Sequence, residues 1–298
     1  MFWSGSPRGK GDLGSGRVQN PLEPEATYGV KQQGGEAKSH VGYKAQVAET
    51  VVEATLEAGE PTRNFVTAIA IQPTHHSDEA GSEAIAKPQA SLGLEPPPVL
   101  YVDGAYVSAA KLVEAAALGR ELVGPVQAAP KRYPDQLTVE DFQVEVEQRR
   151  ALCPAGKPND QCSRLDGKKS ERDPQYRFEW NQTTCGDCAL RGRCLGKGQK
   201  HKSIVVGEHH SALQSRRIEQ KTEAFRRRMH HRAAIEGTQS ELVRAHGLRR
   251  ARYRGLAKVQ LQAWFTGAAC NIKRWLRRVA WASRAGLATG AAALPVTG

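Results

Sequence analysis

The sequence predicts an α/β fold, and three observations support this class. Alternating apolar residues at 43–51 and 65–71 indicate a pair of half-buried antiparallel strands. The continuous apolar run Val99–Val102 is typical of a central strand. Apolar residues at helical spacing cover much of 209–246 and 256–282, which predicts two long helical segments. Strands and helices that alternate along one chain are the pattern of α/β proteins.

Composition limits the class of protein. The chain has 298 residues, 39% of them hydrophobic and 25% charged, which is ordinary for a globular protein with one large or two medium domains. The longest apolar runs, at 99–102 and 65–71, are too short to span a bilayer. Residues 1–10 lack the apolar core of a signal peptide. We therefore expect a cytoplasmic protein with no membrane partner.

The positive charge is concentrated in the last third of the chain. The formal net charge is +12, and residues 201–298 carry 19 Lys and Arg against 5 Asp and Glu. The first 200 residues are therefore close to neutral. A basic field on one part of a protein suits the neutralisation of phosphates, which indicates a polyanionic partner. The alternative is a solvated basic helical surface.

The first part of the chain is predicted to contain a flexible segment followed by a core. Residues 1–40 are rich in Gly, Ser, Pro and charge, and we expect a flexible N-terminal segment there. Residues 41–126 are expected to form the first part of the core. A helix is predicted over 78–93, in which Pro88 favours a kink or an early end.

The end of this first part has clear boundary residues. Ser108 is expected to cap a helix that runs to about Leu118, where Gly119 provides a stop. Another strand is predicted at 122–126.

The remaining chain divides into three predicted parts. Residues 127–205 contain five of the six cysteines and many turn formers, and they are predicted to form a small Cys-rich insertion. Residues 206–285 are predicted to complete the core with helices and to carry a basic DNA-binding segment, and 286–298 form a tail. One face of the last helix is expected to pack onto a sheet through Leu261, Phe265, Ala268, Ile272, Trp275 and Val279.

Two carboxylates occupy positions that suit metal chemistry. Asp103 follows the apolar strand, and the small Gly104 and Ala105 would allow a ligand or a DNA backbone to approach. Glu236 lies at helical spacing from Phe225, Met229 and Arg232, which places it on a partly apolar, core-facing stripe. Taken singly, Asp103 could cap the next helix, and Glu236 could simply pair with Arg232. Together they fit a two-metal site for phosphodiester chemistry, because magnesium prefers oxygen ligands.

The sequence resembles the bacterial insertion-sequence DDE transposases. The resemblance is carried by two runs, His230–Thr238 (HHRAAIEGT) and His246–Gly255 (HGLRRARYRG). Within them Glu236 follows Arg232 by four residues, as the last catalytic glutamate does in this family. Met229 stands where many relatives have tyrosine, and Arg244 is the best match to the basic residue after the glutamate.

The resemblance implies an RNase H-like mixed sheet with packed helices, the Cys-rich insertion and a helical C-terminus. It implies that Asp103 and Glu236 are catalytic ligands of Mg²⁺ or Mn²⁺, with Arg232 beside them. No apolar strand that ends in aspartate precedes Gly42, and Asp12 lies in a Gly-rich context. We therefore expect a truncated copy that lacks the first catalytic aspartate and is nearly inactive alone.

The cysteines predict a structural zinc site. Cys185, Cys188 and Cys194 form a Cys-x2-Cys-x5-Cys run, and Cys153 could supply a fourth thiolate. Cysteines at similar places in the resembling family support this interpretation. Cys162 or His201 could replace one ligand, and reduced thiols without metal are the alternative. Cys270 is expected to be a core residue of the last helix.

The leading hypothesis is transposition of a bacterial insertion sequence by a DDE mechanism. The expected partner is double-stranded DNA, both element ends and target, with self-association on DNA and a nucleoid-associated location. The arginines expected to bind the DNA backbone are Arg244, Arg249, Arg250, Arg252 and Arg254. Two rival hypotheses remain, a non-catalytic DNA-binding remnant and a zinc-stabilised interaction protein without a nucleic-acid role.

Overall fold

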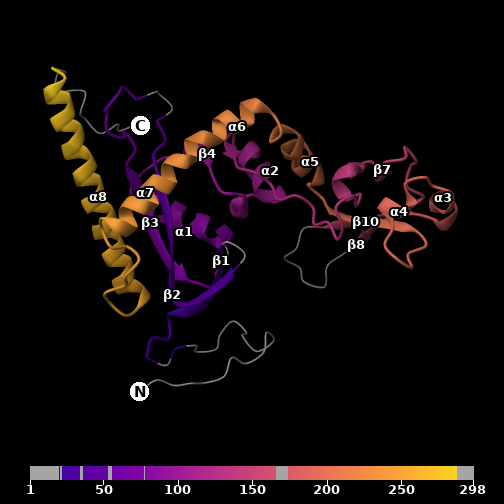
Figure 1. Cartoon of the computed structure of the whole chain (residues 1–298), viewed down its shortest axis with the longest axis horizontal. Helices are drawn as coiled ribbons and strands as arrows, with labels where there is room; N and C mark the ends of the chain where they lie inside the picture. The colour runs from indigo at the N-terminus through magenta and orange to yellow at the C-terminus, as the bar shows by residue number, and fades with distance from the viewer. Residues whose placement is uncertain are drawn as a thin grey trace. The chain divides into compact units, whose positions relative to one another are not determined.

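The protein has a mixed α/β fold. A computed structural model describes residues 20, 22–33, 36–52, 56–76, 78–165 and 174–286 (Figure 1). The chain forms two compact units: unit 1 contains Met1–Pro96 with His231–Gly298, and unit 2 contains Pro97–His230. Among the helices of the described residues, none has both the length and the apolar content needed to cross a membrane.

Unit 1 is a three-stranded antiparallel sheet with helices, and its strand order is β1-β2-β3. Val47 in β2 lies opposite Ile69 in β3, so the predicted antiparallel pair is confirmed. The elements are β1 (Thr27–Gln33), β2 (Glu36–Glu49), β3 (Val66–Pro73), α1 (Asp78–Ser91), α7 (Ala233–Arg244) and α8 (Leu256–Arg284). Helix α1 contains Pro88 close to its end, in agreement with the predicted early end.

The expectation that residues 1–40 lie outside the core is wrong for their last third. Strand β1 and the beginning of β2 form a hairpin with Thr27 opposite Gly42. Tyr28 and Val30 in β1 are exposed while the polar Thr27 is buried, so the apolar residues of this strand do not mark its buried face. The hydroxyl of Tyr43 donates a hydrogen bond to Glu23, which attaches the start of the described chain to β2.

Helix α8 lies along β3, the edge strand of the sheet. The side-chain amide of Asn271 accepts from the backbone N–H of Val66 at 2.9 Å and donates to its carbonyl at 2.8 Å. Gln260 accepts from the N–H of Ile71 at 2.8 Å and donates to the carbonyl of Ile69 at 2.7 Å. These two amides take the place of a neighbouring strand, because unpaired backbone groups at a sheet edge need partners.

The face of α8 that packs is the opposite of the predicted one. The buried positions are Val259, Ala263, Thr266, Gly267, Cys270, Arg274 and Ala282, so Cys270 is a core residue as expected. A Cβ at Gly267 would lie 3.1 Å from Ile69, which shows how closely the helix approaches β3. The exposed stripe contains Leu261, Trp264, Phe265, Ile272, Trp275 and Leu276. The pattern of apolar residues could not reveal that the strand edge requires amides and small residues instead.

A buried arginine joins four segments of unit 1. The side chain of Arg274 on α8 is 4% exposed and donates to the carbonyl of Asn64 at 2.9 Å and to Thr238 at 2.7 Å. It also pairs with Glu241 at 3.0 Å and with Glu49 at 3.4 Å. Burial raises the pKa of Glu49, against the opposing effects of Thr238 and Arg274. Removing the arginine would leave buried carboxylates unpaired, which typically costs about 3–5 kcal/mol.

Unit 2 contains a parallel strand pair, two small antiparallel sheets and short helices. Strand order is β4-β5, β6-β7 and β10-β9-β8. Its elements are β4 (Val99–Tyr101), η1 (Gly104–Tyr106), α2 (Ala109–Ala117), β5 (Glu121–Val123), η2 (Val139–Asp141), β6 (Gln143–Glu145), β7 (Arg150–Leu152), β8 (Gln161–Leu165), β9 (Gln175–Trp180), α3 (Gln182–Gly186), α4 (Arg191–Cys194), β10 (Lys202–Gly207), α5 (His210–Glu219) and α6 (Glu223–Met229).

The predicted helix cap at Ser108 is confirmed. The strand predicted at 122–126 corresponds to β5, which is shorter. Ser108 is the N-cap of α2, and its side chain accepts from the N–H of Lys111. Gly119 has a positive φ of 65° directly after the helix, as a helix stop requires. Strand β4 differs from the predicted central strand, because Leu100 is 44% exposed and only β5 pairs with β4 among the described residues.

The helical stretch predicted at 209–246 is broken into separate helices. Helices α5 and α6 belong to unit 2, a short 3-10 turn spans His230–Arg232, and α7 belongs to unit 1. Thr222 starts α6 as its N-cap, which separates it from α5. The four residues placed on one helical face by spacing therefore do not share one helix.

Helices α5 and α6 are fixed to the β4-β5 pair by polar contacts. The side chain of Gln220 accepts from the N–H of Val126 at 2.9 Å, and Arg216 donates to the carbonyl of Gly124 at 3.1 Å. Arg228 on α6 holds Glu121 with two hydrogen bonds, at 2.5 and 2.7 Å.

The predicted insertion at 127–205 lies entirely within unit 2, and its boundaries remain predictions.

Replacing the amides that cover β3 should destabilise the protein. Gln260→Ala and Asn271→Ala each remove the partners of one backbone donor and one acceptor, so each should lower the free energy of unfolding by about 1–3 kcal/mol. The two sites share no partner, so the effects should add in the double variant. Urea denaturation measures the loss. Ile272→Ala is the control, because the side chain of Ile272 is exposed, and this variant should change the free energy of unfolding by less than about 0.5 kcal/mol. Equal effects of all three variants would contradict the role of the two amides in covering β3.

Candidate functional site

Asp103 lies at the carboxyl end of β4, as predicted. It is the N-cap of the short η1 helix, and its carboxylate accepts from the N–H of Gly104 at 2.7 Å. The residue is exposed. A strand end gives this carboxylate a fixed backbone position while its side chain faces solvent.

The close packing beside Asp103 is internal. A Cβ at Gly104 would lie 2.9 Å from the carbonyl oxygen of Pro125, so glycine is required here by the fold. A Cβ at Gly124 would likewise lie 2.7 Å from the side chain of Val107 and 2.8 Å from that of Val102. The expectation that Gly104 leaves room for a ligand is therefore wrong, while the neighbouring Ala105 is exposed.

Glu236 lies in the first turn of α7 and is exposed. Its side chain is 67% exposed and lies 3.4 Å from Nη2 of Arg232. The prediction of a core-facing carboxylate is wrong, because Thr238 and Leu242 form the buried face of α7. A carboxylate in the first helical turn interacts favourably with the helix dipole.

Asp103 belongs to unit 2 and Glu236 belongs to unit 1. Both are exposed carboxylates at the ends of regular elements, so both are accessible to a hydrated divalent cation. Magnesium takes oxygen ligands and keeps several waters, which suits exposed carboxylates. The chemistry of these two residues therefore fits the expected metal.

Neither β1 nor β2 ends in an exposed carboxylate, since the side chain of Glu49 at the end of β2 is 3% exposed. The strand that precedes β2 is β1, and it ends at Gln33. Asp12, the other candidate considered from the sequence, lies outside the described residues.

A cluster of possible metal ligands that the sequence did not reveal lies in unit 1. Ligand atoms of Glu241, His246 and Cys270 lie within 4.8 Å of one another. Nε2 of His246 is buried without a hydrogen-bond partner among the described residues, and Oε1 of Glu241 has ion pairs with Lys273 and Arg277. Glu241 lies five residues after Glu236, on another face of α7, and no sequence motif marks it.

Positive charge around this cluster opposes metal binding. Arg274 lies 3.0 Å from the carboxylate of Glu241, and Lys273 lies 3.3 Å from it. Burial, followed by the charge of Lys273, lowers the pKa of His246, and burial raises the pKa of the Cys270 thiol. A divalent cation would meet these positive charges and a protonated thiol. We interpret the cluster as part of the Arg274 network.

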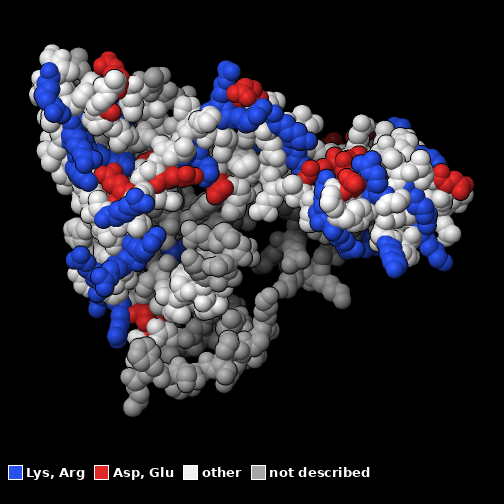
Figure 2. All heavy atoms as spheres, in the orientation of Figure 1, with Lys and Arg blue, Asp and Glu red and all other residues white. Residues whose placement is uncertain are grey.

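The arginines predicted to contact DNA lie on the loop between α7 and α8. The loop residues Arg249, Arg250, Arg252 and Arg254 are all exposed, as is Arg244 at the end of α7. Figure 2 shows Lys and Arg side chains gathered on the left of the view, in the region of this loop and of α8. Exposed guanidinium groups on one loop can reach successive phosphates of a nucleic acid.

The loop is held in one conformation by its neighbours. The side chain of Gln262 accepts from the N–H of Arg252 at 2.8 Å and donates to the carbonyl of Arg250 at 2.7 Å. Glu23 accepts from the N–H of Gly255 at 2.9 Å, and Glu25 accepts from the N–H of Leu256 at 2.8 Å. The two glutamates cap the start of α8, so the arginines extend from a fixed backbone.

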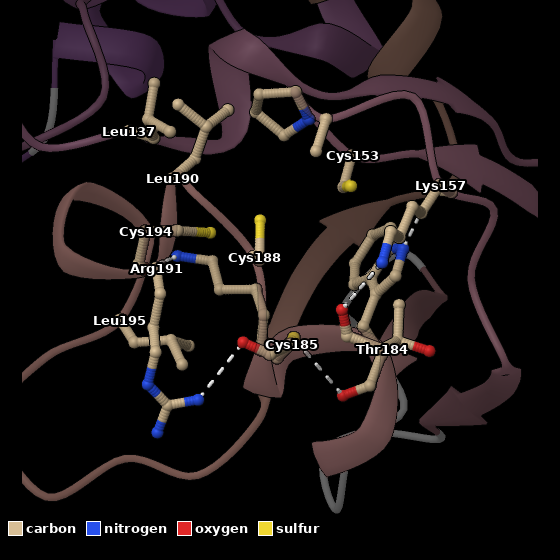
Figure 3. Close-up of a pocket in the computed structure, with 14 residues that line it drawn as sticks. Leu137, Cys153, Lys157, Thr184, Cys185, Cys188, Leu190, Arg191, Cys194 and Leu195 are labelled. Atoms are coloured by element: carbon tan, nitrogen blue, oxygen red, sulfur yellow. Dashed lines mark hydrogen bonds between the residues drawn. The ribbon is translucent and has the colours of Figure 1, made fainter.

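The four cysteines predicted to bind zinc line one cavity in unit 2. The cavity has a volume of about 20 Å³, and Cys153, Cys185, Cys188 and Cys194 all line it. Figure 3 shows Cys153, Cys188 and Cys194 directed toward a common space, with Cys185 below them. Cys162 and His201, the alternative ligands, do not line this cavity.

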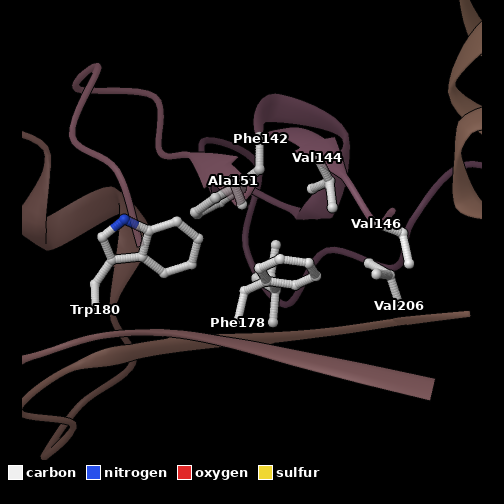
Figure 4. Close-up of a cluster of buried hydrophobic side chains, with 8 residues drawn as sticks. Phe142, Val144, Val146, Ala151, Phe178, Trp180 and Val206 are labelled. Atoms are coloured by element: carbon white, nitrogen blue, oxygen red, sulfur yellow. The ribbon is translucent and has the colours of Figure 1, made fainter. Parts of the chain in front are cut away.

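A hydrophobic cluster adjoins this cavity, and Trp180 belongs to both. Trp180 and Phe178 are fully buried and pack with Phe142 and valines of β6 and β10 (Figure 4). The rings of Phe142 and Trp180 are 5.1 Å apart. Cys153, Cys185 and Cys194 pack against the same cluster, which fixes where their backbones lie.

Comparison with known proteins gives one family match. Residues 152–276 match the family model described as Transposase DDE domain. The matched segment contains Glu236, Arg232, the arginine loop and all four cavity cysteines, whereas Asp103 lies outside it. Searches of curated proteins and of solved structures gave no match. Residues 152–276 are therefore similar to a DDE transposase domain.

Proposed function

We propose that this chain is a transposase of a bacterial insertion sequence that cuts and joins DNA strands by metal-dependent phosphodiester transfer. The observation that carries the proposal is the family match over 152–276, which includes Glu236 with Arg232 beside it and the exposed arginine loop. A catalytic carboxylate and a phosphate-binding surface in one matched segment are the two features that such chemistry requires.

Asp103 and Glu236 are the proposed ligands of Mg²⁺ or Mn²⁺. When bound, the ions activate the attacking oxygen and stabilise the leaving oxygen. Asp103 presents its carboxylate from the rigid end of β4, and Glu236 presents its own from the first turn of α7. Arg232, 3.4 Å from Glu236, orients that carboxylate or binds a phosphate oxygen.

An RNase H-like arrangement is the proposed framework. The order of elements supports it, since the antiparallel pair β2-β3 is followed by β4 with a carboxylate at its end. In such a framework an earlier strand would supply a further aspartate. With two such carboxylates among the described residues, the described part of the chain is proposed to bind DNA but to cleave it poorly, because a two-metal site needs further ligands.

Double-stranded DNA is the proposed partner, at the element ends and at the target, with self-association on DNA. Arg249, Arg250, Arg252 and Arg254, together with Arg244, would contact the backbone. The same observation supports the second candidate, a non-catalytic DNA-binding remnant. The two candidates differ only in whether the carboxylates bind metal.

Metal binding can be tested without relying on cleavage of DNA. Fe²⁺ substituted for Mg²⁺ cuts the protein backbone next to its ligands when ascorbate and peroxide are added. We expect cuts near Asp103 and near Glu236, detected by gel and mass spectrometry. Asp103→Asn and Glu236→Gln should each weaken the cuts about tenfold or more. Removing a metal ligand should reduce metal affinity more than removing a residue that only hydrogen-bonds to a ligand.

The control for this experiment is Glu223→Gln. Glu223 is also an exposed helical glutamate with arginines three and four residues away, and its side chain is 60% exposed. Its replacement should leave the cuts unchanged. If Asp103→Asn suppresses the cuts at both places, the two residues share one metal site. Cuts that survive both catalytic substitutions would contradict the assignment and leave the DNA-binding remnant as the better proposal.

Arginine substitutions test the DNA-binding surface. Arg249→Ala and Arg250→Ala should weaken binding of duplex DNA uniformly across sequences. Each should also reduce the slope of log affinity against log salt by about one, because each neutralises one phosphate. Fluorescence anisotropy over a range of salt concentrations measures the slope.

Arg227→Ala provides the matched control for the arginine experiment. Arg227 is exposed on α6, outside the loop, with a side chain 78% exposed. It should leave the salt slope unchanged. Equal effects of all three substitutions would indicate attraction to net charge only, which favours the zinc-stabilised interaction protein over either DNA-binding function.

A further inference from the structure

The four-cysteine cavity is the strongest feature that the proposed transposase chemistry does not use. Its walls combine the thiols with apolar side chains, among them Leu137, Leu190 and Leu195. All four cysteines are free in the structure. A group of thiols gathered around a small cavity with apolar walls is the donor set of a thiophilic metal.

The elements that carry the thiols are too short to be stable alone. Cys185 lies in α3, which has five residues, and Cys194 ends α4, which has four. Helices of this length are marginal in water. Cys153 lies in a turn closed by its N–H to the carbonyl of Lys157 at 2.9 Å, where Gly156 has a φ of 73°. A metal link would stabilise such short segments further.

Positive groups are anchored around the thiols. Nζ of Lys202 donates to the carbonyl of Cys194 at 2.9 Å, and Arg191 donates to the carbonyl of Cys185 at 3.1 Å. Lys157 donates to the carbonyl of Thr184 at 3.4 Å. Four thiolates around one Zn²⁺ leave a net charge of −2, and nearby cations held on backbone carbonyls would offset it.

The thiols surround the cavity more widely than a closed metal site requires. A tetrahedral site with Zn–S bonds of about 2.3 Å brings sulfur atoms to about 3.8 Å of one another. No three of these sulfur atoms lie within 4.8 Å of each other in the described structure. Metal binding would therefore draw the α3–α4 segment and the Cys153 turn closer together.

We propose that Cys153, Cys185, Cys188 and Cys194 bind one structural Zn²⁺, which links the Cys153 turn to the α3–α4 segment. The ion joins residues more than thirty positions apart in the sequence and completes the part of unit 2 that the Phe142–Trp180 cluster begins. This site is independent of the proposed catalytic carboxylates, so either proposal can fail while the other stands.

Zinc content and cobalt spectroscopy of the full chain test the proposal. Protein purified under reducing conditions should contain about one zinc ion per chain. After exchange with Co²⁺ it should show sulfur-to-cobalt charge-transfer bands and the intense visible bands of a tetrahedral thiolate site. A chelator should lower the melting temperature, because metal binding free energy contributes to folding.

Single Cys→Ser variants identify the ligands. Replacing Cys153, Cys185, Cys188 or Cys194 should abolish stoichiometric zinc and the tetrahedral cobalt spectrum. Cys162→Ser is the matched control, since Cys162 packs on the same hydrophobic cluster but does not line the cavity, and it should retain both. Because ligand variants could fail to fold, the wild-type cobalt spectrum decides independently. Absence of zinc with rapid alkylation of all four thiols, or disulfides among the four cysteines in protein purified without a reductant and still free of zinc after reduction, would overturn the proposal.

Discussion

The free edge of β3 is the constraint on which unit 1 depends. An edge strand exposes N–H and carbonyl groups that must find partners, and here Gln260 and Asn271 provide them. A side-chain amide can accept from a backbone N–H and donate to a carbonyl at the same position, and α8 presents two such residues to the sheet. Gly267, between them, allows the helix to come close to Ile69. The apolar stripe of α8 is consequently left in contact with solvent.

The buried polar network extends this constraint to the candidate site. Arg274 lies on the buried face of α8, as Gly267 does, and its side chain reaches Glu241 and Thr238 on α7. It thereby sets the rotation of α7, with Leu242 in the core and Glu236 outside. The backbone of the arginine loop is fixed separately, through Gln262 and the two glutamates that cap α8. Side chains of α8 thus contribute to the placement of both the carboxylate and the guanidinium groups.

Unit 2 uses a different means of stabilisation in each of its parts. The parallel pair β4-β5 is short, and it is held by side chains of α5 and α6 that reach backbone carbonyls and Glu121. The Cys-containing part has its own aromatic cluster, centred on Phe178 and Trp180, but its outer helices are very short. Small structures with limited cores commonly rely on metals or disulfides. The placement of the cysteines around one cavity agrees with this general need.

The sequence by itself determined the α/β class, the β2-β3 pair, the Ser108 cap and the strand-end position of Asp103, because these depend on local periodicity and turn chemistry. It also identified the cysteines that line one cavity, three of them by the short spacing between Cys185 and Cys194. Only the tertiary structure decided which face of α8 is buried, that Glu236 is exposed, and that Gly104 serves packing against Pro125. These features depend on partners distant in the chain, above all the unpaired edge of β3, and hydrophobic periodicity contains no information about a backbone group that needs a hydrogen bond.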